Sequence, residues 1–264
     1  MVLNLARRLK TKSSTAVNDD ARMSLPRRPF PAVDDRADAD DAERIAVMRG
    51  HCRIGALAGI SGALFGHLVR FARRRPGRPL RVLDLSSGDD DLALRLVDTA
   101  DRRGLPLQMT VLVPDRWSLD QQQQMMDRWK LNADVVCRDV FRQGLPDGFD
   151  VILCALWMHR VDDARAIRLI QSMQMAASGL LLCDWERSRT NLAAAWAASR
   201  LVSRSPALRK DAIDSVYAAF TREEFRGIVH RALARPVDVE RLVPGCWVVR
   251  IDEIAVPAIV PAFA

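Results

Sequence analysis

The stretch that decides the fold is Leu80-Arg81-Val82-Leu83-Asp84-Leu85-Ser86-Ser87-Gly88-Asp89-Asp90-Asp91. Its first six residues form an apolar run of strand length, and an amphipathic helical pattern follows over Leu92–Ala100. A strand that leads into a helix through a short glycine-containing turn is typical of the first βα unit of an open α/β sheet. Ligands of such sheets bind beside this turn, outside the carboxyl ends of the strands.

The rest of the chain continues the alternation of strands and helices. Further apolar runs of strand length lie at Met109–Val113, Ala133–Cys137, Phe149–Cys154 and Gly179–Cys183, with helical patterns at Trp117–Leu131 and Asp162–Ala177. This alternation predicts a parallel, doubly wound sheet with helices on both faces. Two last runs, Val237–Leu242 and Trp247–Ile251, are joined at Pro244-Gly245 and must form an antiparallel hairpin. The expected fold class is therefore α/β and Rossmann-like, with a mostly parallel seven-stranded sheet.

The composition divides the chain into three parts. Residues 1–33 contain basic residues, serines and prolines, and are expected to form a disordered basic tail. Residues 34–78 are expected to form N-terminal helices, and the six carboxylates at 34–43 suit a helix start. Residues 79–264 then form the α/β domain. Within it, residues 185–220 are expected to form a helical lid insertion over the ligand crevice.

The formal net charge of +7 is concentrated at one end of the chain. Residues 1–30 hold seven basic and two acidic side chains, so the remaining 234 residues carry a net charge of only +2. A nearly neutral folded part does not favour a nucleic-acid-binding function. Six arginines without an acid lie in 70–81, and we interpret this stretch as a helix end and a solvated linker.

The cysteines and histidines give no sign of a metal site. The five cysteines are odd in number and include no CxxC pair, and the four histidines lack metal-ligand spacing. Reduced, buried thiols in a cytoplasmic protein are the simplest interpretation.

The N-terminus lacks the apolar core of a secretory signal. The apolar segment Ile54–Val69 has the small-xxx-small spacing of membrane helices, but it falls short of the ~20 residues that span a bilayer. A buried, closely packed helix is the preferred interpretation.

The turn after the first strand excludes two common classes of ligand. A dinucleotide fingerprint would place glycines at 86, 88 and 91, and only Gly88 is present, so NAD or FAD is not expected. The GKS/T sequence of a phosphate-binding loop is absent as well.

Residues 82–93 resemble the first motif of class I S-adenosylmethionine-dependent methyltransferases, in which an apolar run and an aspartate precede G-x-G-x-G. Asp139 stands where that family places an acid near the adenine, Leu145–Cys154 resembles its approach to the fourth strand, and Leu156–Asp163 resembles the segment that follows. The resemblance covers residues 80–190 and implies S-adenosyl-L-methionine as the cofactor. The residues that it places at the cofactor are Asp84, Ser86, Gly88, Asp90, Val113, Asp115, Asp139, Val140 and Leu156.

The whole chain is similar to the small-molecule branch of that family, which is related to quinone-biosynthesis methyltransferases. More narrowly, it resembles bacterial methyltransferases encoded beside type III polyketide synthases. The segments that carry this likeness are Arg49–Ile54, Asp184–Arg189, Leu208–Asp211 and Ala219–Thr221. The resemblance implies a cytoplasmic enzyme of secondary metabolism that methylates an apolar, aromatic, polyketide-like or quinone-like small molecule.

The chain departs from the family pattern at two places. The first and third glycines of the motif are Ser86 and Asp90 here, where the backbone must approach the cofactor closely. The Asp90 carboxylate would repel the cofactor carboxylate, but it would also pair with the cofactor ammonium or cap the following helix. The acid that normally accepts both ribose hydroxyls is replaced by Val113, and Asp115 substitutes for it only if Pro114 bends the chain. Each unsatisfied hydroxyl costs ~1–3 kcal/mol.

His159 is the best candidate for a general base, because it follows the fourth predicted strand at the crevice and imidazole titrates near neutral pH. The alternative is a histidine that packs or hydrogen-bonds near the cofactor without exchanging protons. The family's second histidine is Arg160 here. The candidates for substrate contact are Trp157, Trp185, Arg187 and Tyr217, with Trp196 as a further aromatic candidate. Asp184 and Arg187 also suit a structural salt bridge at the crevice mouth.

Two functional hypotheses follow. The first is a methyltransferase with a small-molecule substrate. The second is a non-catalytic protein that keeps the fold and acts as a binding or partner module, which the residues at 86, 90 and 113 favour. Neither involves nucleic acid, and the sequence does not indicate an oligomeric state. We do not expect membrane association, although docking through Ile54–Val69 and the basic tail is compatible with both hypotheses.

Overall fold

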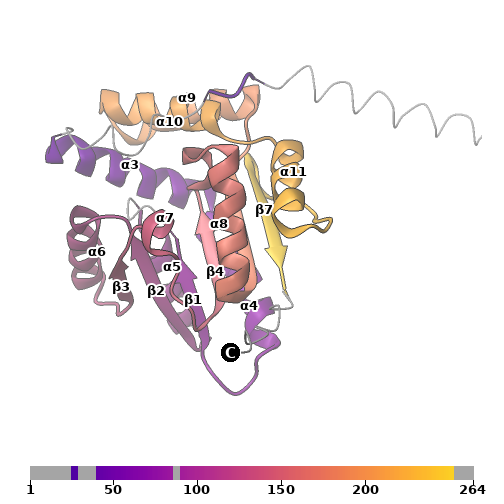
Figure 1. Ribbon diagram of the computed structural model, residues 1–264. Coiled ribbons are helices and arrows are strands. Elements are labelled where there is room, and N and C mark those ends of the chain that lie inside the picture. The colour runs from indigo at the N-terminus through magenta and orange to yellow at the C-terminus, as the bar shows by residue number, and fades with distance from the viewer. Residues whose placement is uncertain (1–24, 29–39, 86–89, 253–264) are drawn as a thin grey trace, which may run out of the picture.

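The computed structural model describes residues 25–28, 40–85 and 90–252. Within this part of the chain, seven strands form one sheet in the order β3-β2-β1-β4-β5-β7-β6 (Figure 1). The strands are β1 (Leu80–Asp84), β2 (Leu107–Val113), β3 (Asp134–Cys137), β4 (Phe149–Ala155), β5 (Ala177–Trp185), β6 (Glu240–Val243) and β7 (Cys246–Ile251). The predicted mostly parallel sheet with a C-terminal antiparallel hairpin is confirmed.

The first five strands run parallel, so their carboxyl ends lie at one edge of the sheet. Leu83 of β1 pairs with Thr110 of β2 on one side and with Ile152 of β4 on the other. β7 runs antiparallel to β5, and β6 begins at Glu240 rather than at Val237, because Val237 packs on the core instead of pairing. The carboxyl edge is therefore the place where residues of β1, β4 and β5 converge.

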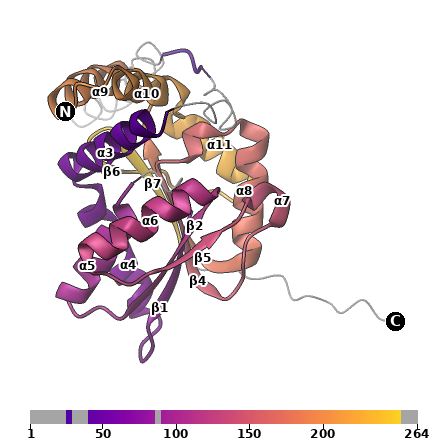
Figure 2. The ribbon, with the colours of Figure 1, turned by 90° about the vertical axis from the view of Figure 1, so that its left-hand side faces the viewer.

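Helices cover both faces of the sheet (Figure 2). The helices are α3 (Asp41–Ala58), α4 (Ile60–Arg73), α5 (Leu92–Arg102), α6 (Arg116–Trp129), α7 (Val140–Gln143), η2 (Met158–Arg160), α8 (Asp163–Ala176), α9 (Arg189–Val202), α10 (Pro206–Ala218) and α11 (Arg222–Leu233). Successive strand residues point to opposite faces. Leu83 and Ile152 share a buried cluster with α8 and α11, whereas Val82 and Leu153 share one with α4 and α5.

A further helical layer, formed by α3, α9 and α10, lies across the carboxyl edge of the sheet (Figure 1). The segment Ile54–Val69 is not the single helix that its composition suggests. It breaks at Gly59, whose φ of 69° ends α3 and starts α4, and the two helices are bent by 67°. Among the described residues no single helix has the length and hydropathy of a membrane span, although α3 and α4 pass as a bent pair.

Gly50 of α3 lies directly against α10 of this layer. A methyl group added at Gly50 would lie 2.2 Å from the buried Leu208 side chain of α10. The glycines that suggested close packing, Gly55, Gly62 and Gly66, have no such neighbour within 4 Å. Beside this contact, the His51 Nε2 of α3 lies 2.7 Å from the Asp211 Oδ2 of α10. The close helix–helix contact, at Gly50, therefore lies before Ile54–Val69, the segment for which close packing was predicted.

Replacing Gly50 by alanine is expected to lower the free energy of unfolding by about 1–3 kcal/mol, because the added methyl overpacks the α3–α10 contact. Gly62→Ala is the matched control, since that helical glycine has open space around it and alanine favours helix by up to about 1 kcal/mol. Urea unfolding of both variants checks the difference. Equal stability of the two variants would show that the contact is loose.

Residues 25–28, which lie inside the predicted disordered tail, are bound to the fold. The Arg187 side chain donates to the carbonyl oxygens of Leu25 and Ala219 and to Glu224. Arg27 donates to the carbonyl oxygens of Ala218 and Val161 and to Asp163, with its guanidinium 3.6 Å above the Phe220 ring. These two arginines join the tail, the end of α10 and the start of α8. The other residues of 1–33, apart from 25–28, lie outside the described residues.

Three of the arginines in the 70–81 stretch bind one carboxylate at the opposite edge of the sheet. The buried Asp150 of β4 accepts two bonds from the Arg78 guanidinium, at 2.6 and 2.7 Å, and one from the Arg81 backbone N–H at 2.9 Å. The Arg75 Nε lies 3.5 Å from the same carboxylate. Burial raises the pKa of Asp150, but these bonds and charges outweigh it and hold the pKa below its usual value. The stretch is therefore not simply a solvated linker.

Replacing Asp150 by asparagine is expected to lower the free energy of unfolding at neutral pH by about 2–3 kcal/mol, because charge-assisted bonds are lost. The pKa of Asp150 is depressed in the folded state, so its contribution is present above the unfolded value of about 4 and is lost as pH falls through the folded value. The difference between wild type and variant should therefore shrink below pH ~4. Asp98→Asn, which breaks a more exposed pair with Arg102, should cost less than about 1 kcal/mol. Chemical unfolding across pH measures both.

Candidate functional site

Two fully buried carboxylates mark the carboxyl edge of the sheet. Asp84 ends β1 and Asp184 lies near the end of β5, and both are 0% exposed. β4 runs between them and carries the buried Cys154, whose pKa is raised by burial and by the charges of Asp184 and Asp84. Because an aspartate side chain is almost never fully buried unless a charged or hydrogen-bonding group pairs with it, these positions are candidates for a functional site.

Asp184 fixes the position of His159. The His159 Nδ1 lies 2.8 Å from Asp184 Oδ1, and the His159 backbone N–H donates to Asp184 Oδ2 at 2.7 Å. The Trp185 backbone N–H donates to the same carboxylate. Because a carboxylate accepts, the ring proton is assigned to Nδ1, and Nε2 is the basic nitrogen of the neutral ring. A histidine oriented by a buried carboxylate is suited to proton transfer.

The structure only partly describes the loop after β1. Ser86 and Gly88, both predicted to contact the cofactor, lie outside the described residues. Asp90 Oδ1 accepts from the Leu92 backbone N–H at 3.0 Å, which is the helix-capping role considered for it. The neighbouring Asp91 forms two bonds with Arg95, at 2.6 and 2.8 Å. The pairing of Asp90 with a cofactor ammonium remains a prediction.

The end of β2 offers no carboxylate pointing from the strand. Val113 is fully buried in the cluster on the α5 face. Asp115 is exposed and caps α6 by accepting from the Ser118 backbone N–H at 2.7 Å. Its other oxygen lies 3.6 Å from Arg44 of α3. The Asp115 carboxylate is therefore already engaged in contacts within the protein. The Val113 side chain has no polar atom that could accept a hydrogen bond from a ribose hydroxyl.

Three other predicted cofactor residues lie around the ends of β3 and β4. Asp139 caps the short helix α7 by accepting from the backbone N–H groups of Phe141 and Arg142. Val140 opens α7 and packs on the core. Leu156, which directly follows β4, has a φ of 56° in the left-handed region. Such a backbone is uncommon for leucine and often occurs at functional sites.

The predicted substrate residues do not all reach the same place. Trp157 is half-buried and stacks on Phe141, with ring centroids 6.0 Å apart. Trp185 is half-buried at the end of β5. Tyr217 carries the Arg28 guanidinium over its ring, at 4.3 Å from the centroid. Trp196 lies on the exposed side of α9, which does not support its predicted place in a pocket. Arg187 donates hydrogen bonds to Leu25, Ala219 and Glu224, and its contact with a substrate stays a prediction.

The layer of α3, α9 and α10 covers this edge. Burial, followed by the charges of Asp91 and Asp90, raises the pKa of the Cys52 thiol on α3. Arg44 of α3 lies over the Trp117 ring, with its Cζ 3.7 Å from the centroid. Sequence patterns do not reveal these contacts, because they join segments that are distant along the chain. A lid over residues 185–220 stays a prediction, and α3 packs beside α9 and α10 in the layer over the edge.

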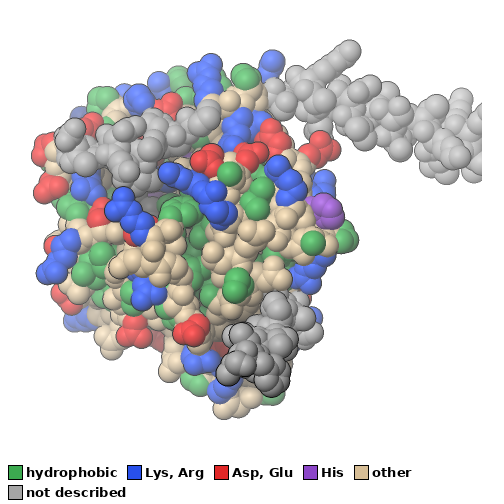
Figure 3. All heavy atoms as spheres, viewed as in Figure 1, with side chains coloured by type: hydrophobic (Ala, Val, Ile, Leu, Met, Phe, Trp, Pro, Cys, Tyr) green, Lys and Arg blue, Asp and Glu red, His purple; other side chains and the backbone are tan. Residues whose placement is uncertain are grey.

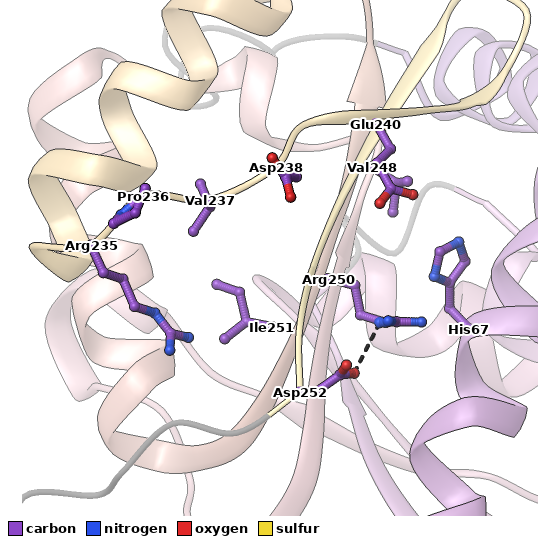
Figure 4. A pocket seen from close by; sticks show the side chains of 10 residues that line it. All are labelled: His67, Arg235, Pro236, Val237, Asp238, Glu240, Val248, Arg250, Ile251 and Asp252. Carbon is purple, nitrogen blue, oxygen red and sulfur yellow. Dashed lines mark ion pairs between the residues drawn. The ribbon is translucent and has the colours of Figure 1, made fainter.

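A cavity of about 320 Å³ lies elsewhere, between α4 and the β6–β7 hairpin (Figure 4). It contains His67, Arg235 and Glu240 on its walls, and an Arg250–Asp252 ion pair. This cavity is near Ile251, which pairs with Leu180, whereas Asp184 lies at the other end of β5. It is therefore separate from the carboxyl edge.

Within the described ranges, no cluster of three or more His, Cys, Asp or Glu side chains has the arrangement of a metal site.

The comparisons with known proteins establish the fold. No protein-family profile matches the sequence, and no curated protein is similar to it in sequence. Mitomycin 7-O-methyltransferase MmcR superposes with a TM-score of 0.57 at 17% identity, over 84% of this chain and 61% of that one. The plantazolicin methyltransferase BamL, in complex with a triazolic desmethylPZN analog and SAH, gives 0.55 at 16% identity, over 77% and 79%. An O-methyltransferase family 2 protein from Planctomyces limnophilus, in complex with apigenin, gives 0.57 at 14%, over 83% and 64%.

This chain therefore has the fold of class I S-adenosylmethionine-dependent methyltransferases. It spans less than two thirds of the length of two of these three proteins. At identities of 14–17% the similarity concerns the fold, and the function has to be inferred from the site.

Proposed function

We propose that the protein is an S-adenosylmethionine-dependent methyltransferase that acts on an apolar, aromatic, polyketide-like or quinone-like small molecule. The observation that carries the proposal is the buried His159–Asp184 pair, which lies at the carboxyl edge beneath the helical layer. This is the edge at which ligands bind in open α/β sheets. Mitomycin 7-O-methyltransferase, which shares the fold, is named for the methylation of a small-molecule oxygen.

The residues at the carboxyl edge of the sheet are better suited to bind the methionine end of the cofactor than to bind its ribose. The buried Asp84 carboxylate supplies the charge that would hold an ammonium group, and the turn that follows it precedes the amino end of α5. At the end of β2, Val113 lacks a polar side-chain atom and Asp115 is engaged by the Ser118 N–H and Arg44. We therefore expect S-adenosylmethionine to bind with lower affinity than a carboxylate at 113 would allow.

When bound, S-adenosylmethionine would supply a methyl group on a positively charged sulfur; its transfer to an oxygen or carbon nucleophile would break the sulfur–methyl bond and release the demethylated thioether. The nucleophile is activated when a phenol or enol loses its proton. His159 Nε2 accepts that proton as the bond to the methyl group forms, and the Asp184 carboxylate stabilises the resulting imidazolium. The helical layer excludes water and holds the acceptor in line, with Trp157 and Trp185 as candidates for its apolar walls.

A second candidate function is a non-catalytic binding or partner module with the same fold. The observation that favours it is the end of β2, where the buried Val113 replaces a ribose acceptor. Such a protein would keep the His159–Asp184 pair as a structural contact. The two candidates differ in whether the cofactor binds and turns over.

Calorimetric titration with S-adenosylmethionine, and with its demethylated product, tests the proposal. We expect saturable binding of both ligands, with micromolar to millimolar dissociation constants because the ribose acceptor is lost. Absence of detectable heat at millimolar ligand would overturn the methyltransferase and favour the binding module. Release of the demethylated product in the presence of a panel of phenols and enols then identifies the acceptor class.

The same proposal places the protein in the cytoplasm, in secondary metabolism, with a small-molecule substrate and without nucleic acid. The five free cysteines support a reducing compartment.

A further inference from the structure

The outer side of α9 is apolar and exposed. Leu201 is 80% exposed and Trp196 is 55% exposed, and the exposed alanines Ala193, Ala194 and Ala197 lie on the same side of the helix. α3 extends this surface, because Arg53 donates to the Val202 carbonyl oxygen and Leu57, one helical turn later, is 66% exposed. Large apolar side chains this exposed, on adjacent helices, indicate an interaction surface.

The same surface is positively charged. The segment 188–205 contains Arg189, Arg200 and Arg204 and no acidic residue; Arg189 and Arg200 are exposed on α9, and Arg204 is exposed in the connection between α9 and α10. The Arg200 guanidinium lies 4.1 Å from the centroid of the Trp196 ring and donates to the Trp196 carbonyl oxygen. Lys and Arg side chains appear among apolar ones along the upper border of Figure 3, where α9 and α10 lie in Figure 1.

We propose that this surface, which we call the α9 face (Leu57, Arg189, Trp196, Arg200, Leu201 and Arg204), docks on an anionic lipid bilayer. A helix with arginines beside tryptophan and leucine has the composition of helices that lie in the membrane interface. The arginines gain from the negative lipid headgroups, while Leu201, Leu57 and Trp196 leave water for the boundary of the acyl chains. The surface shares Leu57 with the segment Ile54–Val69, but the buried side chains of that segment, Ile60, Leu64, Phe65 and Leu68, pack on the sheet and take no part in the α9 face.

An anionic bilayer fits the α9 face better than a nucleic acid or an acidic protein. A polyanion would satisfy the arginines, but it would leave Leu201 and Leu57 in water. The face is part of the helical layer over the carboxyl edge, so docking would bring the lid of the candidate site against the membrane. An apolar acceptor dissolved in lipid would then be close to the site. The docking proposal does not depend on the proposed function, because it concerns binding of the protein to a membrane and not the rate of methyl transfer.

Flotation of the full chain with vesicles tests the proposal. We expect binding to vesicles that contain phosphatidylcholine and about one third phosphatidylglycerol at about 0.1 M salt, and weaker binding as salt shortens the range of the charges. Vesicles of phosphatidylcholine alone should bind at least roughly tenfold less. Equal binding to both vesicle types, or binding to neither, would overturn the proposal.

Two pairs of variants locate the surface. Arg189→Gln with Arg200→Gln and Arg204→Gln should weaken binding roughly fivefold per arginine, on the order of a hundredfold in all. The matched control, Arg102→Gln with Arg128→Gln and Arg226→Gln, changes the net charge equally on α5, α6 and α11 and should bind as wild type. Leu201→Glu should weaken binding roughly tenfold or more, whereas Met175→Glu, at the similarly exposed Met175 of α8, should not.

Equal losses in the α9 variants and their controls would overturn the assignment of the surface. Binding to RNA or to an acidic peptide that matches or exceeds binding to the vesicles would overturn the choice of partner. Thermal melts of every variant serve as the folding check, and since all the altered side chains are exposed, the melting temperatures should stay within a few degrees.

Discussion

Replacing His159 by glutamine is expected to lower methyl transfer by about 10²–10⁴-fold, because a positioned general base contributes that factor. Glutamine keeps a polar side chain of similar reach but cannot take up the proton. Cofactor binding should stay unchanged, since His159 is proposed to act on the acceptor. The measurement pairs product release, followed over time, with calorimetric titration of the cofactor.

His67→Gln is the matched control, because His67 is a partly buried histidine of α4 beside the separate cavity. It should leave the rate unchanged. Asp184→Asn should also reduce the rate, because an amide cannot stabilise the imidazolium in the way that a carboxylate does. If product release survives in His159→Gln, the histidine is a packing and hydrogen-bonding residue, and the assignment of the base is wrong.

Replacing Asp84 by asparagine is expected to weaken binding of S-adenosylmethionine by about a hundredfold or more. Loss of one partner from a buried charge pair costs 2–5 kcal/mol. Asp84 is 0% exposed, yet asparagine has nearly the same shape and removes the cost of a buried charge, so the fold should persist. Wild-type protein should gain roughly 2.7 kcal/mol of stability at a hundredfold excess of cofactor over its dissociation constant, and the variant should gain almost none.

Asp115→Asn is the control for the other end of the cofactor. Its carboxylate is held by the Ser118 N–H and lies near Arg44, so the change should weaken binding by less than roughly tenfold. A large loss would show that Asp115 replaces the missing ribose acceptor. Unchanged binding in Asp84→Asn would remove Asp84 from the cofactor site.

Much of the fold was predictable because the signals are local. Apolar runs of strand length, helical periodicity and the turn at Pro244-Gly245 depend only on nearby residues, and they predicted the sheet and its hairpin correctly. The break at Gly59 was not predicted, because a glycine inside an apolar helical pattern is tolerated and does not by itself end a helix. A lid over residues 185–220 stays a prediction, and the structure brings α3, α9 and α10 together over the carboxyl edge (Figure 1).

The candidate site was predictable only in part. Asp84 ends a strand and His159 comes shortly after one, and the carboxyl ends of parallel strands meet, so their placement at one edge could be inferred. The bond between His159 and Asp184 joins residues of two neighbouring strand ends, and its geometry needed the structure. From the sequence, Arg187 suits contact with a substrate and a structural salt bridge equally well. The structure shows its bonds to Leu25 and Glu224.

The order of strands and helices along the chain and the α/β class follow from local sequence patterns, and the motif at 82–93 indicates the fold. The packed structure was needed to show that Asp150 binds arginines from 70–81, that Gly50 lies against Leu208 of α10, and that residues 25–28 are held by Arg187. The physical reason is that strand and helix patterns follow from neighbours along the chain. Charge pairs, close contacts and exposed faces depend on which distant segments the packing brings together.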